Sequence, residues 1–246
     1  MLQFVVGDRF SSLSQDKLYI TYSDFIKKTL SQTPSAIEHP FYMPAQGLNQ
    51  GCRQKISNEN ARLNNKKNSD VIIMQSKEAM HKSNQKNVLI TKLRTIASGQ
   101  YQSELIIDND NEFLLDHFSG QHIPGMIFLE ATRQLSIASW AALVDDDPDN
   151  VSMIINDIHC EYKKFAFPFC IHITVNIHPV GENYQVDINF TQNNDVVVRT
   201  FGTFKVVPRQ KLSKMENLLM KKKSGQRSKQ LLNLMTKGNS PQRVSQ

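Results

Sequence analysis

The stretch from Gly125 to Leu143 constrains the fold of this chain more than any other, because it is apolar on almost every side. Pro124 ends the preceding segment, and Gly125 supplies the backbone freedom for a tight start of a helix. Apolar residues then recur at helical spacing, and Glu130 and Arg133 are the only charged residues among them. A helix of this composition is buried, so the sequence predicts one central helix with other elements packed around it.

Glu130 and Arg133 are three residues apart and therefore lie on one face of that helix. One interpretation is a structural ion pair, since a buried carboxylate must be paired. The other is a functional pair, because it lies close to a helix N-terminus, where free N–H groups favour an anion or a polarised carbonyl. His117 and His122 lie just upstream and could approach the same end. Together these groups make an acyl-transfer site a reasonable hypothesis.

The 246 residues carry a formal net charge of +6, but this charge is unevenly distributed. Residues 211–246 hold nine Lys or Arg and one acid, a net +8, whereas residues 77–210 hold eleven Lys or Arg and sixteen Asp or Glu, a net −5. The basic character therefore belongs mainly to the C-terminal tail. An acidic central region argues against a basic groove for nucleic acid.

The three cysteines, Cys52, Cys160 and Cys170, are isolated and lack metal-ligand spacing. Such a set predicts reduced thiols in a cytoplasm rather than a disulfide framework. His159 and Cys160 would point to opposite faces of a strand, so we expect no metal site. We expect no cofactor either, because no nucleotide-binding loop is present. The N-terminus does not resemble a signal peptide, and no apolar stretch is long enough to span a bilayer.

Composition divides the chain into three predicted segments. Residues 1–76 are expected to form an N-terminal extension, with a short helix capped by Ser23 and a loose linker over 49–70, where Asn, Lys and Gln dominate. Residues 77–208 are expected to pack as one domain. Residues 209–246 are expected to form a basic, partly helical or disordered tail, which could contact anionic lipid or an acidic carrier protein.

Strand patterns lie on both sides of the central helix. They cover Val88–Ile96, Tyr101–Ile107, Val151–Tyr162, Phe169–Val180, Tyr184–Thr191 and Val196–Val207. His172 and His178 alternate with apolar residues, so we expect them on the solvent side of a strand rather than as ligands. The order of strands, helix and further strands predicts an α+β fold, in which an antiparallel sheet wraps around one long central helix.

Two motifs of this chain resemble those of the A-factor biosynthesis hotdog family. Met80-His-Lys-Ser-Asn-Gln-Lys-Asn-Val-Leu-Ile-Thr91 is similar to the family's His-Lys/Arg…Val-Leu-x-Thr strand. The run from Leu115 to Gln134, with Asp-His-Phe, Gln-His-Ile-Pro-Gly-Met and Leu-Glu-Ala-Thr-Arg-Gln, is similar to the family's Asp-His-Pro…Asp-His-Val-Pro-Gly-Met…Leu-Glu-Ala…Arg-Gln helix. The resemblance covers about 77–207 and implies a hotdog fold, of which this chain has a single recognisable copy.

The resemblance also implies an activity, which is biosynthesis of a γ-butyrolactone-type signal. A β-ketoacyl group would pass from acyl carrier protein to the hydroxyl of dihydroxyacetone phosphate. The family's functional pair falls on Glu130 and Arg133, and its two motif histidines fall on His117 and His122. The implied partners are an acyl carrier protein or acyl-CoA thioester and a small phosphorylated acceptor.

In such a reaction the thioester carbonyl would rest at the helix N-terminus, where the N–H groups of Gly125 and Met126 would stabilise the oxyanion. Glu130, with a pKa raised toward neutrality by burial, or His117 would accept the proton of the attacking hydroxyl. Arg133 would hold either ionised Glu130 or a phosphate of the acceptor. The acyl chain would lie between helix and sheet or along a dimer seam.

The chain also departs from the family pattern. Family members usually carry two hotdog copies, but residues 1–76 contain no second copy of either motif, and Phe118 and Gln121 replace the motif's proline and aspartate. A single copy with open sheet edges favours a homodimer. Two other functions stay open. One is thioester hydrolysis or hydroxyacyl dehydration, since the helix motif is also similar to that of β-hydroxyacyl-carrier-protein dehydratases. The other is a non-catalytic role in acyl-chain binding or as an interaction subunit.

Overall fold

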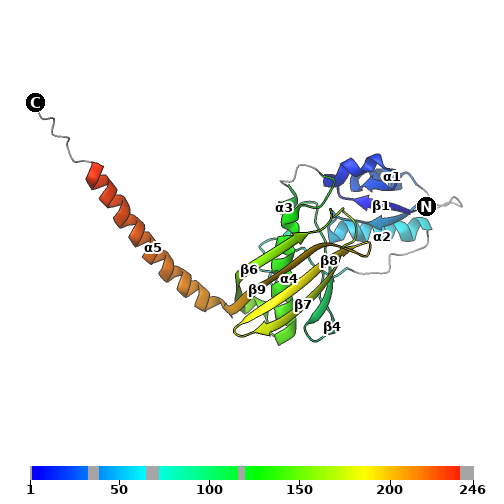
Figure 1. Ribbon diagram of the computed structural model, residues 1–246. Coiled ribbons are helices and arrows are strands. Elements are labelled where there is room, and N and C mark those ends of the chain that lie inside the picture. The colour runs from blue at the N-terminus through cyan, green and yellow to red at the C-terminus, as the bar shows by residue number, and fades with distance from the viewer. Residues whose placement is uncertain (1, 33–38, 65–71, 116–119, 239–246) are drawn as a thin grey trace, which may run out of the picture. The chain divides into compact units, whose positions relative to one another are not determined.

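The structure is a computed structural model that describes residues 2–32, 39–64, 72–115 and 120–238, with side chains up to residue 233. The chain divides into two compact units, Met1–Asp149 with Met153–Lys205 and Asn150–Ser152 with Val206–Gln246. The first unit contains a long helix, a large antiparallel sheet and a smaller parallel sheet (Figure 1).

Helix α4, Gly125–Val144, is the central element of the first unit. It begins after Pro124, whose backbone is extended (φ −60°, ψ 140°), and it ends at Asp145, which adopts a left-handed conformation with φ 55°. Residues on nearly every side of the helix are buried, including Ile127 and Leu135 at 0% exposure. The predicted central helix is therefore confirmed, to within one residue at its C-terminal end.

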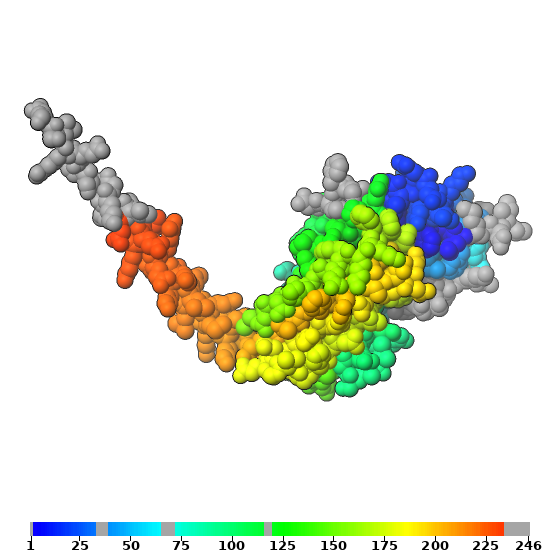
Figure 2. Space-filling model, viewed as in Figure 1, coloured from blue at the N-terminus to red at the C-terminus, as the bar shows by residue number. Residues whose placement is uncertain are grey.

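The large sheet has the strand order β4-β5-β7-β8-β9-β6. Its strands are β4 (Arg94–Ala97), β5 (Gln100–Glu104), β6 (Val151–Tyr162), β7 (His172–Val180), β8 (Asn183–Gln192) and β9 (Asp195–Pro208). The β4–β5, β5–β7, β7–β8 and β8–β9 pairs are antiparallel. In the view of Figure 1 the strands β6, β7, β8 and β9 lie across α4, and Figure 2 shows the same view with all atoms drawn. The predicted α+β hotdog architecture is confirmed.

Alternation along β7 explains how the sheet packs on the helix. Ile173, Val175 and Ile177 are buried, whereas His172 and Asn176 on the opposite face are exposed. This is the period-two pattern of a strand with one covered face. The predicted β4–β5 hairpin is also present.

Residues 2–32 and 39–64 form a layer that the sequence analysis did not anticipate. A three-stranded parallel sheet has the order β2-β1-β3, with β1 at Leu2–Val6, β2 at Tyr19–Thr21 and β3 at Phe41–Pro44. Helices α1 (Tyr22–Leu30) and α2 (Gln50–Asn64) pack with it around their own buried cluster, which includes Val5, Phe25, Tyr42, Leu48 and Ile56. Short helical segments lie between the main elements: η1 (Asp8–Gln15), η2 (Gln85–Asn87), α3 (Glu112–Leu115) and η3 (Pro148–Asn150).

Two expectations for this layer are wrong. The loose linker over 49–70 is replaced, from Gln50 to Asn64, by helix α2, whose buried residues Ile56, Asn60 and Leu63 follow helical spacing. Asn60 is one of them because its side chain accepts a hydrogen bond from the Tyr42 N–H (2.9 Å) and donates one to the Tyr42 carbonyl (2.7 Å). A buried polar residue that pairs with a strand backbone gives no apolar signal in the sequence.

The cap of helix α1 is also different from the prediction. Thr21, not Ser23, is the N-cap, because its hydroxyl accepts the Asp24 N–H (3.2 Å). Ser23 lies inside the helix and donates through its hydroxyl to the Asp8 carboxylate (2.7 Å). The helix therefore starts two residues earlier than the Ser23 cap would require.

Gln46 joins the N-terminal layer to the large sheet. Its fully buried side chain donates to the carbonyls of Leu105 (2.7 Å) and Phe169 (3.1 Å) and accepts the Ile107 N–H (2.8 Å). The Gln46 N–H donates to the carbonyl of Pro168 (2.9 Å). One side chain thus satisfies three backbone groups from two separate segments of the hotdog domain.

The second unit consists mainly of helix α5, Arg209–Gly238. Its described side chains are almost all exposed, including Leu218 at 70% and Leu232 at 60%. Among the described residues, no helix combines the length and the apolar character that a bilayer-spanning segment needs. Contact of the tail with anionic lipid or an acidic carrier stays a prediction.

We expect Gln46→Ala to lower the free energy of unfolding by about 3 kcal/mol, because it leaves buried backbone donors and acceptors unsatisfied. Urea unfolding measures the change. The matched control is Gln54→Ala on the exposed face of α2, which should stay within about 0.5 kcal/mol of the parent. A loss below about 1 kcal/mol in Gln46→Ala would contradict the joining role of this side chain.

Candidate active site

The N-terminus of α4 is packed by Tyr162 from strand β6. The Tyr162 hydroxyl donates to the Gly125 carbonyl (2.9 Å), and a Cβ at Gly125 would lie 2.9 Å from that hydroxyl, which is too close. Among the residues that the structure describes, no side-chain hydrogen bond caps the helix, and Met126 is 55% exposed. The helix therefore starts at an open end, with glycine required by the approach of Tyr162. This geometry suits the predicted use of the Gly125 and Met126 N–H groups, which stays a prediction.

Glu130 is held by three neighbouring side chains. Its Oε1 atom lies 2.8 Å from Lys82 Nζ and 2.8 Å from an Arg133 guanidinium nitrogen, and it accepts the Gln134 amide at 2.9 Å. Its Oε2 atom accepts the Arg133 Nε–H at 3.1 Å. The carboxylate is 11% exposed, so it is nearly buried but not sealed from solvent. The predicted meeting of Glu130 and Arg133 is therefore observed.

The same residues fasten the segment 80–89 to α4. Arg133 donates to the Met80 carbonyl at 2.8 Å. Gln134, fully buried, donates to the Asn87 carbonyl (2.9 Å) and accepts the Leu89 N–H (2.9 Å). The two motifs that resemble the hotdog family thus meet through hydrogen bonds between residues 45 to 53 positions apart in sequence. Both interpretations of the Glu130–Arg133 pair are compatible with this arrangement.

The expected direction of the Glu130 pKa is wrong. Burial alone raises the pKa of this carboxyl, but the hydrogen bond and charge of Arg133, with hydrogen bonds from Lys82 and Gln134, outweigh burial and hold the pKa below its ordinary value. The sequence argument counted the apolar helix and one guanidinium and missed the second cation. Glu130 is therefore ionised at neutral pH.

Lys82 and Gln134 are the site residues that the sequence analysis missed. Lys82 follows His81 in the first motif, and Gln134 follows Arg133 in the second. Both residues were therefore part of the motifs on which the resemblance rests, but the resemblance assigned no function to either of them. His81 has a left-handed backbone (φ 53°), and its Nε2 lies 2.9 Å from the Pro148 carbonyl. This turn brings Lys82 against Glu130. The strained backbone of a non-glycine residue marks the position as one that tertiary contacts define.

The structure describes one of the two motif histidines. His117 lies outside the described residues. His122 is half-buried before the start of α4, with its ring 5.3 Å from the Phe165 ring in an edge-on contact (66°). Glu130 is the sixth residue of the helix, about 7.5 Å along its axis from Gly125. The catalytic role expected for either histidine stays a prediction.

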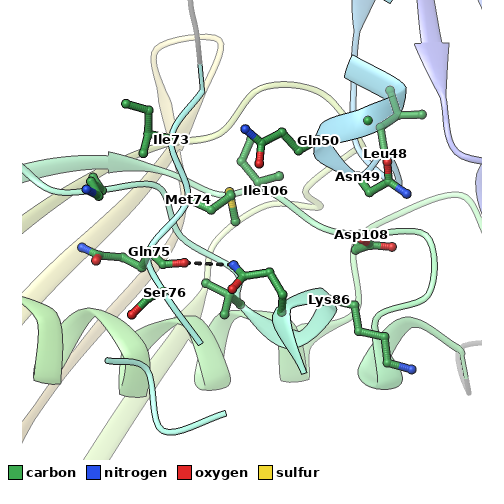
Figure 3. Close-up of a pocket in the computed structure, with 14 residues that line it drawn as sticks. Leu48, Asn49, Gln50, Ile73, Met74, Gln75, Ser76, Lys86, Ile106 and Asp108 are labelled. Atoms are coloured by element: carbon green, nitrogen blue, oxygen red, sulfur yellow. Dashed lines mark hydrogen bonds between the residues drawn. The ribbon is translucent and has the colours of Figure 1, made fainter. Parts of the chain in front are cut away.

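A pocket of about 600 Å³ lies on the other side of the segment that Gln134 holds (Figure 3). Its walls combine the N-terminal layer with the hotdog domain and hold apolar residues, two lysines, uncharged polar residues and the carboxylate of Asp108. They include Leu48, Ile73, Lys86, Val88, Lys92 and Ile106. By contrast, the space that α4 and the strands β6, β8 and β9 enclose is about 10 Å³, which is too small for an acyl chain. The expected placement of the acyl chain, between helix and sheet or along a dimer seam, stays a prediction.

We expect Gln134→Ala to cost about 2–4 kcal/mol of stability, because the Leu89 N–H and the Asn87 carbonyl lose their buried partner. Gln185→Ala on the exposed side of β8 is the control and should change stability little. Thermal or urea unfolding of both variants measures the change in the free energy of unfolding. Equal stability of the two variants would show that the Gln134 bridge is dispensable.

The lowered pKa of Glu130 predicts an acid-sensitive contribution to stability. A carboxyl whose pKa falls on folding stabilises the folded protein fully at pH values above its unfolded-state pKa of about 4.3. This stabilisation is lost as the pH falls through the folded-state pKa. Between about pH 6 and pH 3, Glu130→Gln should therefore lose less stability than the parent. Unfolding at several pH values measures this. The control is Glu161→Gln, at an exposed carboxyl, whose stability should change with pH as that of the parent does. If the stability of Glu130→Gln also changes with pH as in the parent, the stabilising role assigned to ionised Glu130 is wrong.

The solved structures that resemble this chain are distant from it. A mutant thioesterase from Pseudomonas aeruginosa is 11% identical, with a TM-score of 0.39 over 48% of this chain and 81% of that one. A thioesterase from Haemophilus influenzae is 12% identical, with a TM-score of 0.37 over 48% and 78%. A dehydratase heterocomplex from Xenorhabdus doucetiae is 11% identical, with a TM-score of 0.44 over 55% and 92%. Similarity at this level carries no information about reaction or substrate.

No curated protein sequence matches this chain significantly. A family match is found instead, over the region that holds α4, the large sheet and the segment 80–89. The model of the A-factor biosynthesis hotdog domain matches residues 64–208, more than half of the chain. The chain belongs to the A-factor biosynthesis hotdog domain family.

Proposed function

We propose that this protein is an acyltransferase that moves a β-ketoacyl group from an acyl carrier protein, or from acyl-CoA, to the hydroxyl of a small phosphorylated acceptor such as dihydroxyacetone phosphate. The observation that carries the proposal is the ionised, nearly buried Glu130 between two cations, within the region that the family model matches. The carboxylate supplies a base, and the helix start supplies N–H donors for an oxyanion.

The two oxygens of Glu130 differ in a way that favours one of them as the base. Among the described residues, Oε1 contacts Lys82, Arg133 and Gln134, whereas Oε2 has a hydrogen bond from Arg133 alone. A carboxylate oxygen has two lone pairs, so Oε2 keeps one for the acceptor hydroxyl. Because its pKa is lowered, Glu130 is ready to accept a proton at neutral pH but is a weak base. Arg133 acts here as a positioning residue that fixes the carboxylate.

The pocket next to segment 80–89 suits an amphipathic substrate. Leu48, Val88 and Ile106 offer apolar walls, and Lys86 and Lys92 offer charges for a phosphate. Arg133 is engaged by Glu130 and the Met80 carbonyl, which makes these lysines better phosphate ligands than Arg133. The pocket therefore supports an acceptor or a thioester carrier arm that contains phosphate.

The three side chains around Glu130 also favour a second candidate, a non-catalytic acyl-binding or interaction protein, because a structural ion-pair network accounts for them without any reaction. Hydrolysis or dehydration uses the same base and differs in the acceptor. The proposal further includes a homodimer, since β4 and β6 are the edge strands of the sheet and all four β4 residues are exposed. A cytoplasmic location is part of the same proposal.

The test is incubation of the protein with a β-ketoacyl thioester on carrier protein, with and without dihydroxyacetone phosphate, followed by mass spectrometry of free thiol and acylated phosphate. We expect ester only when the acceptor is present, and a loss of about 10²–10⁴-fold in Glu130→Gln. Glu161→Gln should retain the parent rate, because its carboxyl is exposed outside the site.

Other outcomes would reassign the protein. Thiol release without acceptor would identify a thioesterase, and loss of water from a β-hydroxyacyl thioester would identify a dehydratase. Absence of any turnover, with thioester binding unchanged in Glu130→Gln, would favour the non-catalytic role. In each case the acyltransferase proposal would be wrong.

A further inference from the structure

Three side chains with metal-binding atoms gather where strands β5 and β7 pair. Glu104, the last residue of β5, lies directly opposite His172, the first residue of β7. Cys170 is two residues before His172 and lies on the same side of the chain. One ligand atom from each residue lies within 4.8 Å of those of the other two. These residues belong to the first unit and are separate from the Glu130 cluster.

The distances between these atoms suit a small divalent ion. His172 Nδ1 lies 3.6 Å from Glu104 Oε1 and 4.0 Å from Cys170 Sγ. With Zn–S near 2.3 Å and Zn–N near 2.0 Å, tetrahedral ligands lie about 3.4–3.6 Å apart. Rotations of exposed side chains close the remaining difference, since the His172 side chain is 66% exposed. A thiolate, an imidazole and a carboxylate are also the ligand types that zinc prefers.

The same three residues line a pocket of about 440 Å³ under the N-terminal layer. Phe4, Phe41 and Met43 provide its apolar side. Because all three ligands line this pocket, an ion bound by them would lie at the cavity, with room for a fourth ligand. Three protein ligands and one open position are the pattern of zinc sites that bind water or a substrate group.

We propose that Glu104, Cys170 and His172 bind one Zn²⁺ ion, with the fourth coordination position facing this pocket. The set carries two negative charges when the thiol is deprotonated, which balance the ion. Binding breaks the S–H bond and releases that proton to solvent. The proposal is independent of the acyltransfer chemistry and replaces the expectation that His172 is only a solvent-side strand residue.

Two simpler explanations of why Glu104, Cys170 and His172 lie together explain fewer of these contacts than a metal ion does. An exposed Glu104–His172 ion pair would contribute little to stability and leaves Cys170 unexplained. A nucleophilic Cys170 is disfavoured, because desolvation in the pocket and the charge of Glu104 raise the pKa of this thiol to about 11, against the opposing charge of Arg53. A metal ion overcomes that protonation by direct coordination.

The test is equilibrium dialysis of the untagged full chain against micromolar Zn²⁺, with metal content measured by plasma mass spectrometry. We expect one zinc per chain, and at least a tenfold weaker affinity in both Cys170→Ser and His172→Gln. Co²⁺ in place of zinc should give a thiolate-to-cobalt absorption band that Cys170→Ser lacks.

Matched controls separate this site from adventitious binding. Cys160→Ser and His178→Gln change a partly buried cysteine and another exposed histidine of β7, and both should bind zinc like the parent. No zinc on the parent protein would overturn the proposal. So would zinc binding that Cys170→Ser and His172→Gln leave unchanged, because the ion would then lie elsewhere.

Discussion

The Glu130 carboxylate and the three side chains that hold it are the interaction on which the rest of the hotdog domain depends. Lys82, Arg133 and Gln134 bind this one group and, through their remaining donors and backbone, fix the segment 80–89 on α4. A nearly buried carboxylate is costly unless it is fully paired, so loss of any partner leaves an uncompensated charge. The motif residues around Glu130 therefore stabilise the fold, independently of the chemistry proposed for them.

The N-terminal layer forms part of the pocket next to the segment 80–89. Residues 1–76 contain no hotdog motif, yet their helix α2 and the strand-like segment near Ile73 form walls of the pocket beside Lys86. Gln46 ties the layer to the sheet through backbone groups on two segments. Residues outside the two motifs thus contribute to the walls of this pocket.

The elements that periodicity could predict are those whose burial depends on apolar side chains. Helix α4 and strands β6–β9 follow such patterns, and their bounds were close to the prediction. Helix α2 and the Glu130 pKa were mispredicted for a common reason. Asn60 packs by pairing with the Tyr42 backbone, and Lys82 reaches Glu130 from 48 residues away. Polar contacts across the fold leave no periodic trace, so the sequence could nominate Glu130 but not its environment.

The measurement that tests this account most directly is a double-mutant cycle between Lys82 and Glu130, from urea unfolding of Lys82→Ala, Glu130→Gln and the double variant. If the carboxylate is the shared partner that holds the segment 80–89, the two changes will be strongly non-additive, with a coupling of about 1–3 kcal/mol. Additive losses would contradict the account, because the two side chains would then contribute independently of each other.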